Sequence, residues 1–144
     1  MTSVKQTQAL VALPFIWPIR VYWEDTDAGG VVYHASYLRF LERARSEWLR
    51  HLGCSQQHLQ QHEDAVFVVR AMQLEFRRPA RLDDALEVDV LPTALRAASL
   101  LIRQQIRRDG EPLLDATVKV ACVSAAGFRP RAVPATLAER LKLP

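Results

Sequence analysis

The apolar residues of this chain change their spacing once, and that change limits the folds it can adopt more than any other feature. Between residues 35 and 52 they recur at the spacing of an amphipathic helix. From residue 72 to residue 122 they alternate with polar residues in four separate segments. Alternation of this kind is typical of strands with one buried face, so we expect one long helix packed against a sheet.

The predicted helix spans residues 35–52, with Ser36 as its N-cap and Gly53 as the residue that ends it. Its apolar face consists of Tyr37, Phe40, Leu41, Ala44, Trp48 and Leu52. The helical spacing places Arg45 close to this apolar face, and its role stays open. It either extends to solvent beside the core or pairs with Glu42 or with an acidic loop residue.

Five strands are predicted, one before the helix and four after it. They cover residues 15–23, 72–76, 86–90, 100–106 and 114–122. Turn-forming residues separate the later strands at Arg78-Pro79-Ala80, at Pro92-Thr93 and at Asp109-Gly110, and the last pair is a strong hairpin signal. Pro18 in the first segment indicates a strand start or an edge strand.

The order of these elements predicts an α+β fold with a five-stranded antiparallel sheet. A polar loop or short helix over residues 54–64 follows the long helix, and a short helix over residues 135–141 closes the pattern. One helix cannot cover both edges of such a sheet, so we expect an edge to pair with a second copy of the chain. The 144 residues fit a leader of residues 1–14 and a single domain of residues 15–144.

Composition indicates an ordinary soluble protein with a cytoplasmic location. Apolar residues make up 49% of the chain, and the net charge of +3 is too small to indicate nucleic-acid binding. Cys54 and Cys122 do not make a disulfide framework, and Cys122 is expected to be buried. The apolar run of residues 9–19 does not read as a secretory signal, because Pro14 and Pro18 interrupt it and it leads directly into a strand.

An acidic segment with two glycines joins the first strand to the helix, and we call residues 24–34 the acidic-glycine loop. It contains Glu24, Asp25, Asp27, Gly29 and Gly30. A carboxylate is thereby placed beside the free N–H groups of a helix N-terminus, as acyl transfer requires. Asp27 is the candidate that attacks a carbonyl or activates water, and the helix start near His34 is the candidate oxyanion site. From these residues alone, a solvated loop whose aspartate caps the helix is the simpler interpretation.

Three stretches of the chain resemble one enzyme family. They are Asp-Thr-Asp-Ala-Gly-Gly-Val-Val-Tyr-His-Ala-Ser-Tyr at residues 25–37 with Phe-Leu-Glu-Arg-Ala-Arg-Ser-Glu-Trp-Leu at 40–49, Phe-Arg-Arg-Pro-Ala-Arg-Leu-Asp-Asp at 76–84, and Arg-Pro-Arg at 129–131 followed by Pro134. These stretches resemble the hot-dog-fold acyl-CoA thioesterases, and most closely the Tol-Pal-associated subfamily related to 4-hydroxybenzoyl-CoA thioesterase. The resemblance implies a five-stranded antiparallel sheet wrapped around one long central helix, a homo-oligomer such as a homotetramer, and no cofactor.

The resemblance also implies roles for individual residues. Asp27 matches the family's catalytic carboxylate, which acts as nucleophile or general base, and His34 matches the position whose backbone N–H polarises the thioester carbonyl. Tyr33 and Tyr37 flank this site and are candidates for the acyl pocket, although core packing is the preferred role of Tyr37. Apart from the resemblance, the basic cluster of Arg77, Arg78 and Arg81 is a candidate for binding the phosphates of coenzyme A, because arginine makes bidentate contacts with phosphate. Ordinary surface charge is the alternative.

Two other groups of polar residues receive structural interpretations. Other hot-dog lineages place a catalytic carboxylate on the long helix, but for Glu42 a salt bridge with Arg45 or Arg39 is favoured. His58 and His62 stand four residues apart without cysteines at zinc-finger spacing, so solvated histidines are favoured over a metal site. The acidic residues of the acidic-glycine loop resemble a Mg²⁺ site only loosely.

The predicted function is hydrolysis of an acyl-CoA thioester to a free acid and coenzyme A. A thiolate leaves readily because a thiol pKa is about 8.5, so the lack of a Ser-His-Asp pattern does not oppose hydrolysis. The acidic-glycine loop argues against a hot-dog dehydratase or hydratase. The alternative is a non-catalytic or weakly catalytic scaffold that binds acyl carrier protein or associates peripherally with the inner membrane. The sequence leaves three questions open. The acyl group can be short-chain, medium-chain or aromatic, the thiol carrier can be coenzyme A or acyl carrier protein, and the oligomer can be a dimer or a tetramer.

Overall fold

Strands and helices follow one another in nearly the predicted order. The computed structural model describes residues 13–141 and 143, so most of the predicted leader lies outside the described residues. The elements are β1 (Phe15–Arg20), the 3-10 turn η1 (Trp23–Asp25), α2 (Ser36–His51), α3 (Gln56–His62), β2 (Val66–Phe76), β3 (Ala85–Leu95), β4 (Ser99–Arg108), β5 (Glu111–Val123) and α4 (Ala135–Leu141). None of these helices is both long enough and apolar enough to cross a membrane.

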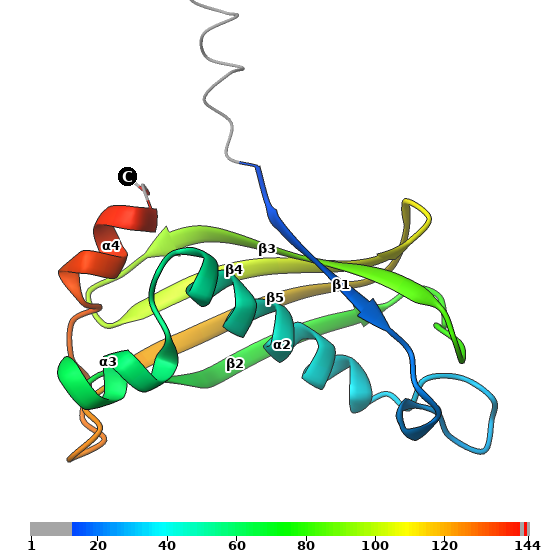
Figure 1. Ribbon diagram of the computed structural model, residues 1–144, viewed down its shortest axis with the longest axis horizontal. Helices are drawn as coiled ribbons and strands as arrows, with labels where there is room; N and C mark the ends of the chain where they lie inside the picture. Colours follow the sequence, from blue (N-terminus) through cyan, green and yellow to red (C-terminus); the bar gives the residue numbers. More distant parts are fainter. Residues whose placement is uncertain (1–12, 142, 144) are drawn as a thin grey trace, which may run out of the picture.

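The strands form one antiparallel sheet in the order β1-β3-β4-β5-β2. Trp17 lies opposite Val88 where β1 pairs with β3, and Ile102 lies opposite Val118 where β4 pairs with β5. β1 and β2 are therefore the two edges. The predicted α+β class and the five-stranded antiparallel sheet are confirmed (Figure 1).

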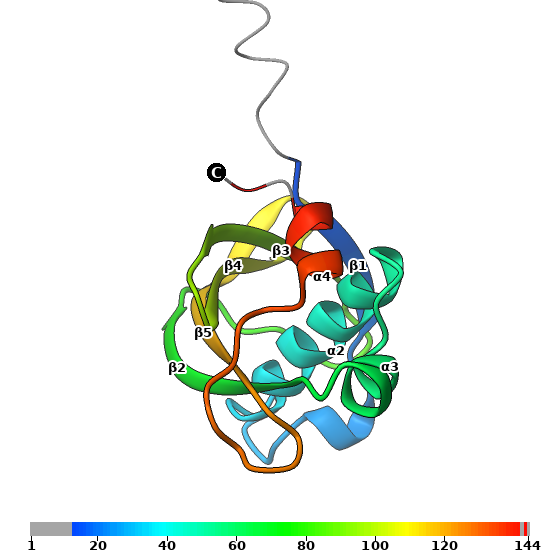
Figure 2. The same ribbon diagram turned by 90° about the vertical axis from the view of Figure 1, so that its left-hand side faces the viewer.

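α2 lies across one face of the sheet, and its apolar face forms the centre of the core. Figure 2 shows the sheet bending toward α2. The buried side chains of the helix are Tyr37, Phe40, Leu41, Ala44, Trp48 and Leu49. They pack with sheet residues that the alternating pattern places on the inner face, namely Leu86, Val88, Val90, Leu100, Ile102, Ile106, Leu114, Val118 and Cys122. Burial also raises the pKa of the Cys122 thiol.

A buried glutamine sets the distance between α2 and the sheet. Gln104 is 3% exposed, and its Nε2 donates to the backbone carbonyls of Leu41 at 3.1 Å and Asp89 at 3.2 Å. Its Oε1 accepts a hydrogen bond from Arg45 at 2.9 Å. This contact answers the open question about Arg45, whose pKa is lowered chiefly by desolvation. Among the described residues, Glu42 forms no ion pair with Arg45 or Arg39, the salt bridge favoured for it. Its carboxylate accepts from Ser46 at 3.2 Å, and its charge acts against the lowering of the Arg45 pKa.

The end of β1 and the start of α2 both differ from the prediction. β1 ends at Arg20 rather than at residue 23, because Asp25 accepts the Tyr22 N–H at 2.8 Å and turns the chain into η1. Ala35, not Ser36, occupies the N-cap, and the Ser36 hydroxyl accepts from Arg39 at 3.2 Å. At the other end of α2 the predicted stop is confirmed, since Gly53 has a φ of 78°.

The turn predicted at Pro92-Thr93 is wrong. Both residues lie inside β3, where the register against β4 shifts between Pro92 and Ala94. A bulge accommodates a proline within a strand because it interrupts the ladder of N–H donors. The strands instead connect through residues 96–98.

The hairpin predicted at Asp109-Gly110 is confirmed. The two residues join β4 to β5 with φ angles of 51° and 80°, the combination of a type I′ turn. The φ of Gly110 lies in the left-handed region, where a side chain is strained even though nothing lies within 4 Å of its Cβ position.

We therefore expect Gly110→Ala to lower the free energy of unfolding by about 1–2 kcal/mol. Gly127→Ala is the matched control, because Gly127 has no left-handed φ and its added Cβ would approach Ser124 Oγ only to 3.4 Å. Urea unfolding of both variants measures the difference. Equal stability of the two would contradict the type I′ turn.

Candidate active site

The acidic-glycine loop is closed on itself directly before α2 (Figure 1). Thr26 and Val32 form an isolated antiparallel bridge, and the Asp27 N–H donates to the Val31 carbonyl at 2.9 Å. Gly30 adopts a φ of 80° at the tip, and its N–H donates to the Asp27 carbonyl at 3.0 Å. The loop thus has a backbone closed by its own hydrogen bonds, and it carries Asp27 in the segment that leads into α2.

The three acidic residues of the loop have different environments. Asp25 is 2% exposed and accepts the Tyr22 N–H, so it holds the chain in η1. Glu24 is exposed on η1. Asp27 is also exposed, and its Oδ1 accepts the Gly29 N–H at 2.8 Å. This bond orients the Asp27 carboxylate and leaves its second oxygen open to a reacting molecule.

His34 provides an N–H donor close to the start of α2. Two residues close to it use their N–H groups within the chain, since Tyr33 N–H donates to the Asp25 carbonyl at 2.9 Å and Ser36 N–H to the Tyr33 carbonyl at 2.8 Å. Within residues 13–141, no protein acceptor receives the N–H of His34. The His34 ring is exposed and lies against the Tyr33 ring, with centroids 4.5 Å apart and the ring planes tilted by 55°. Together with the positive end of the α2 dipole, the open N–H can stabilise an oxyanion.

The turn between β2 and β3 is fastened to the acidic-glycine loop, although the two are far apart in the sequence. Val32 N–H donates to the Ala80 carbonyl at 2.9 Å, and Ala80 N–H donates to the Tyr37 hydroxyl at 3.0 Å. Val21 exchanges backbone hydrogen bonds of 3.0 Å with Asp83 and Asp84. The second stretch of the family resemblance is therefore brought to the first.

Tyr37 belongs to the core rather than to an open pocket. It is 4% exposed, and its ring meets Phe40 and Phe76 edge-on at centroid distances of 6.0 and 5.6 Å. Burial raises the pKa of the hydroxyl, while the hydrogen bond from Ala80 acts in the opposite direction. The hydroxyl therefore stays protonated near neutral pH.

The three arginines named for phosphate binding lie in this same turn, but they are not equivalent. Arg77 forms an ion pair with Asp115, which raises the Arg77 pKa, and Arg78 Nε lies 2.7 Å from Glu111. Arg81 is exposed, and among the described residues no carboxylate lies within ion-pair distance of it. Arg81 is thus the guanidinium of the three that is available to an anionic ligand.

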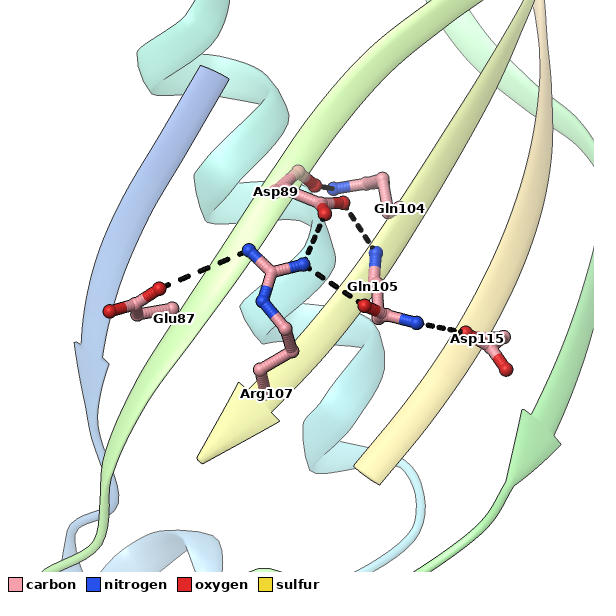
Figure 3. A network of polar contacts seen from close by, with 6 residues as sticks. All are labelled: Glu87, Asp89, Gln104, Gln105, Arg107 and Asp115. Carbon is pink, nitrogen blue, oxygen red and sulfur yellow. Dashed lines mark hydrogen bonds and ion pairs between the residues drawn. The ribbon is translucent and has the colours of Figure 1, made fainter. Parts of the chain in front are cut away.

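Asp115, the partner of Arg77, is part of a polar network on the outer face of the sheet (Figure 3). Gln105 Nε2 donates to Asp115 at 2.7 Å, and the Gln105 backbone N–H donates to Asp89 at 2.6 Å. Arg107 lies 2.6 Å from Asp89 and 3.9 Å from Glu87. The hydrogen bond from Gln105, together with Arg77, lowers the pKa of Asp115.

Sequence reasoning missed Arg108. Its Nη1 donates to Asp84 at 2.7 Å and to the Pro79 carbonyl at 3.2 Å, so the end of β4 supports the turn that carries Arg81. The hairpin at Asp109-Gly110 places this end of β4, but no local pattern predicts its neighbour across the sheet.

His58 and His62 lie one turn apart on α3 with ring centroids 4.7 Å apart.

Comparison with known proteins decides the family. The profile of the thioesterase-like superfamily matches residues 21–141. The acyl-CoA thioester hydrolase YbgC of Escherichia coli O6:H1 is 51% identical over 129 residues, which cover 89% of this chain and 96% of that protein. The acyl-CoA thioesterase YbgC of Helicobacter pylori is 36% identical over 85% of this chain and 96% of that protein. A probable thioesterase from Bartonella henselae superposes with a TM-score of 0.81 and 37% identity, covering 85% of this chain and all of that one.

The chain belongs to the thioesterase-like superfamily. This membership confirms the predicted family and the predicted hydrolase class at the level of the superfamily. The Tol-Pal-associated subfamily and the relation to 4-hydroxybenzoyl-CoA thioesterase stay predictions.

The lowered pKa of Asp115 makes its contribution to stability pH-dependent. Because its pKa is lower in the folded chain than the unfolded value of about 3.9, the carboxylate stabilises the fold above that value and loses this contribution as pH falls below it. We expect Asp115→Asn to lower the melting temperature at pH 7 and to lower it less at pH 3. Thermal unfolding at both pH values measures this, and an equal difference at pH 3 and pH 7 would exclude the carboxylate as its source.

Proposed function

We propose that this chain hydrolyses the thioester of an acyl-CoA to a free acid and coenzyme A. The observation that carries the proposal is Asp27, an exposed carboxylate oriented by Gly29 in the same closed loop as the open N–H of His34. A relative that is 51% identical has the name acyl-CoA thioester hydrolase, which supports the same chemistry for this chain. α2 then serves as the central helix of a hot-dog fold.

Two routes use the same geometry. In the first, an Asp27 oxygen attacks the thioester carbon, the carbonyl oxygen becomes an oxyanion held by the His34 N–H, and the thiolate of coenzyme A leaves. Water then hydrolyses the acyl-aspartyl anhydride and releases the acid. In the second, Asp27 takes a proton from a water molecule that attacks the carbon directly, and the thiolate leaves in the same way. Both routes dispense with a strong general acid because a thiolate is a good leaving group.

The acyl group and the nucleotide would lie on opposite sides of the reacting carbon. Tyr33 is 44% exposed beside His34 and is the candidate for contact with a short-chain, medium-chain or aromatic acyl group. Arg81 is the principal candidate for the phosphates of coenzyme A. Arg77 and Arg78 can join it only by loosening their carboxylate pairs, and ion pairs this exposed are weak because water screens them.

Asp27→Asn is expected to lower kcat by roughly 10²- to 10⁴-fold, because it removes the nucleophile or base while keeping a side-chain oxygen for the Gly29 N–H. Glu24→Gln is the matched control, since Glu24 is an exposed acid three residues away and should leave kcat unchanged. Both variants are assayed on a panel of acyl-CoAs of different chain length and on a benzoyl-CoA. Activity that survives Asp27→Asn would remove Asp27 from the mechanism.

The competing function, a non-catalytic scaffold for acyl carrier protein at the inner membrane, gives a different result in the same panel. It predicts binding of the acylated carrier protein and no turnover of any thioester by the wild type. For the proposed enzyme we infer a cytoplasmic location, because Cys54 and Cys122 are free thiols and the cytoplasm keeps thiols reduced.

The proposed enzyme is a homo-oligomer whose subunits meet at β2. The opposite edge, β1, contains Pro18, which lacks an N–H for pairing. β2 offers a longer edge of 11 residues with Val69 at 47% exposure and Phe76 at 51%. An apolar unpaired edge of this length is favourable for addition of a second sheet.

Val69→Lys is expected to weaken the oligomer, because a buried lysine opposes association at a paired edge. Ile16→Lys is the matched control, since Ile16 has the same 47% exposure on β1. Light scattering over a range of protein concentrations measures both. A shift with Ile16→Lys and none with Val69→Lys would assign the interface to β1.

A further inference from the structure

Tyr37 connects the two halves of the candidate site through a single buried hydrogen bond. Its hydroxyl accepts the N–H of Ala80, and the carbonyl of Ala80 accepts the N–H of Val32. Ala80 is fully buried, so both of its backbone polar groups depend on the segment that carries Asp27 and begins α2. The residue that follows Ala80 is Arg81.

The hydroxyl is itself held firmly. The ring is fixed edge-on between Phe40 of α2 and Phe76 at the end of β2, so the oxygen has little freedom to follow a moving turn. A hydrogen bond to a buried backbone N–H is costly to lose, because nothing else in a dry site replaces the acceptor. The position of Ala80 relative to the acidic-glycine loop is thereby held by two bonds, the N–H of Val32 on the Ala80 carbonyl and the hydroxyl oxygen of Tyr37 on the Ala80 N–H.

Other contacts hold the rest of the turn. Asp84 accepts the Arg81 N–H at 2.8 Å and Arg108 Nη1 at 2.7 Å, Arg20 donates to the Asp83 carbonyl at 2.7 Å, and Arg108 also donates to the Pro79 carbonyl at 3.2 Å. Loss of the Tyr37 hydroxyl should therefore leave the turn folded and loosen it at Ala80, which keeps its bond to Val32. The side chain most affected would be the unpaired guanidinium of Arg81.

We propose that Tyr37 is a positioning residue that holds Arg81 at the distance from Asp27 at which the phosphates of coenzyme A are bound. Tyr37 thereby sets the preference of the site for thioesters that carry the nucleotide, and it contacts neither the acyl group nor the reacting carbon. This inference rests on the proposed function, since it assumes that acyl-CoA is the substrate.

The experiment compares two thioesters of the same acyl group. One is the acyl-CoA, and the other is the acyl-N-acetylcysteamine, which lacks the nucleotide and its phosphates. For Tyr37→Phe we expect KM for the acyl-CoA to rise three- to tenfold with kcat unchanged, and both constants for the truncated thioester to stay at wild-type values. Arg81→Gln should give the same split with about a tenfold rise. Tyr22→Phe, which removes an exposed hydroxyl, is the control.

The double variant Tyr37→Phe with Arg81→Gln tests the connection between the two residues. If Tyr37 acts through Arg81, the KM of the double variant equals that of Arg81→Gln alone. The inference would be overturned if the KM increases of the two single variants multiplied in the double variant. It would also be overturned if Tyr37→Phe changed KM equally for both thioesters. An unchanged KM for Arg81→Gln would overturn it as well.

A second measurement needs no variant at Tyr37. Hydrogen exchange of the Ala80 amide in the wild-type protein should become slower when coenzyme A is added, because a ligand on Arg81 restrains the turn. An exchange rate that coenzyme A does not change would contradict the inference even if Tyr37→Phe failed to fold. If the wild type cleaves neither thioester, the proposed function is wrong. If it cleaves both, but Tyr37→Phe does not raise KM for the acyl-CoA alone, only the role of Tyr37 is wrong.

Discussion

Burial of the apolar face of α2 against the inner face of the sheet is the interaction on which the rest of the molecule depends. Each large apolar side chain that this face removes from water contributes about 1.5–3 kcal/mol, and those of α2 that are buried are Tyr37, Phe40, Leu41, Trp48 and Leu49. Gln104 then fixes how the helix sits, because its amide bonds to the carbonyl of Leu41 and to Arg45. The start of α2, with its N–H groups and dipole, is consequently held at one place beside β1.

The candidate site follows from that placement. The acidic-glycine loop is closed by its own backbone bonds, and Ala80 joins it to the turn that carries Arg81. In the proposed reaction, the His34 N–H and the helix dipole are in position before charge develops on the thioester oxygen. Preorganisation of this kind is the largest contribution to rate in many acyl-transfer enzymes.

Much of the fold could be predicted because periodicity reports burial. The apolar positions Leu86, Val88 and Val90 are buried as the alternation required, and the hairpin at Asp109-Gly110 forms because few other residue pairs adopt two positive φ angles. The errors arose where a local preference met a tertiary contact. Pro92 reads as a turn residue, yet a bulge retains it within β3, and the strand before the acidic-glycine loop ends early because Asp25 captures the Tyr22 N–H.

The sequence by itself determined the fold class, the helix over residues 36–51 and the loop in which a carboxylate precedes the helix start, since hydrophobic spacing and turn chemistry are local properties. The family resemblance had already singled out Asp27, and the tertiary structure adds that Asp25 is buried whereas Asp27 is exposed, because exposure depends on what packs over a side chain. Only the tertiary structure separated Arg81 from Arg77 and Arg78, whose partners come from β5. The bond between Tyr37 and Ala80 joins residues 43 positions apart, and contacts at that separation are decided by the packing of the whole sheet against α2.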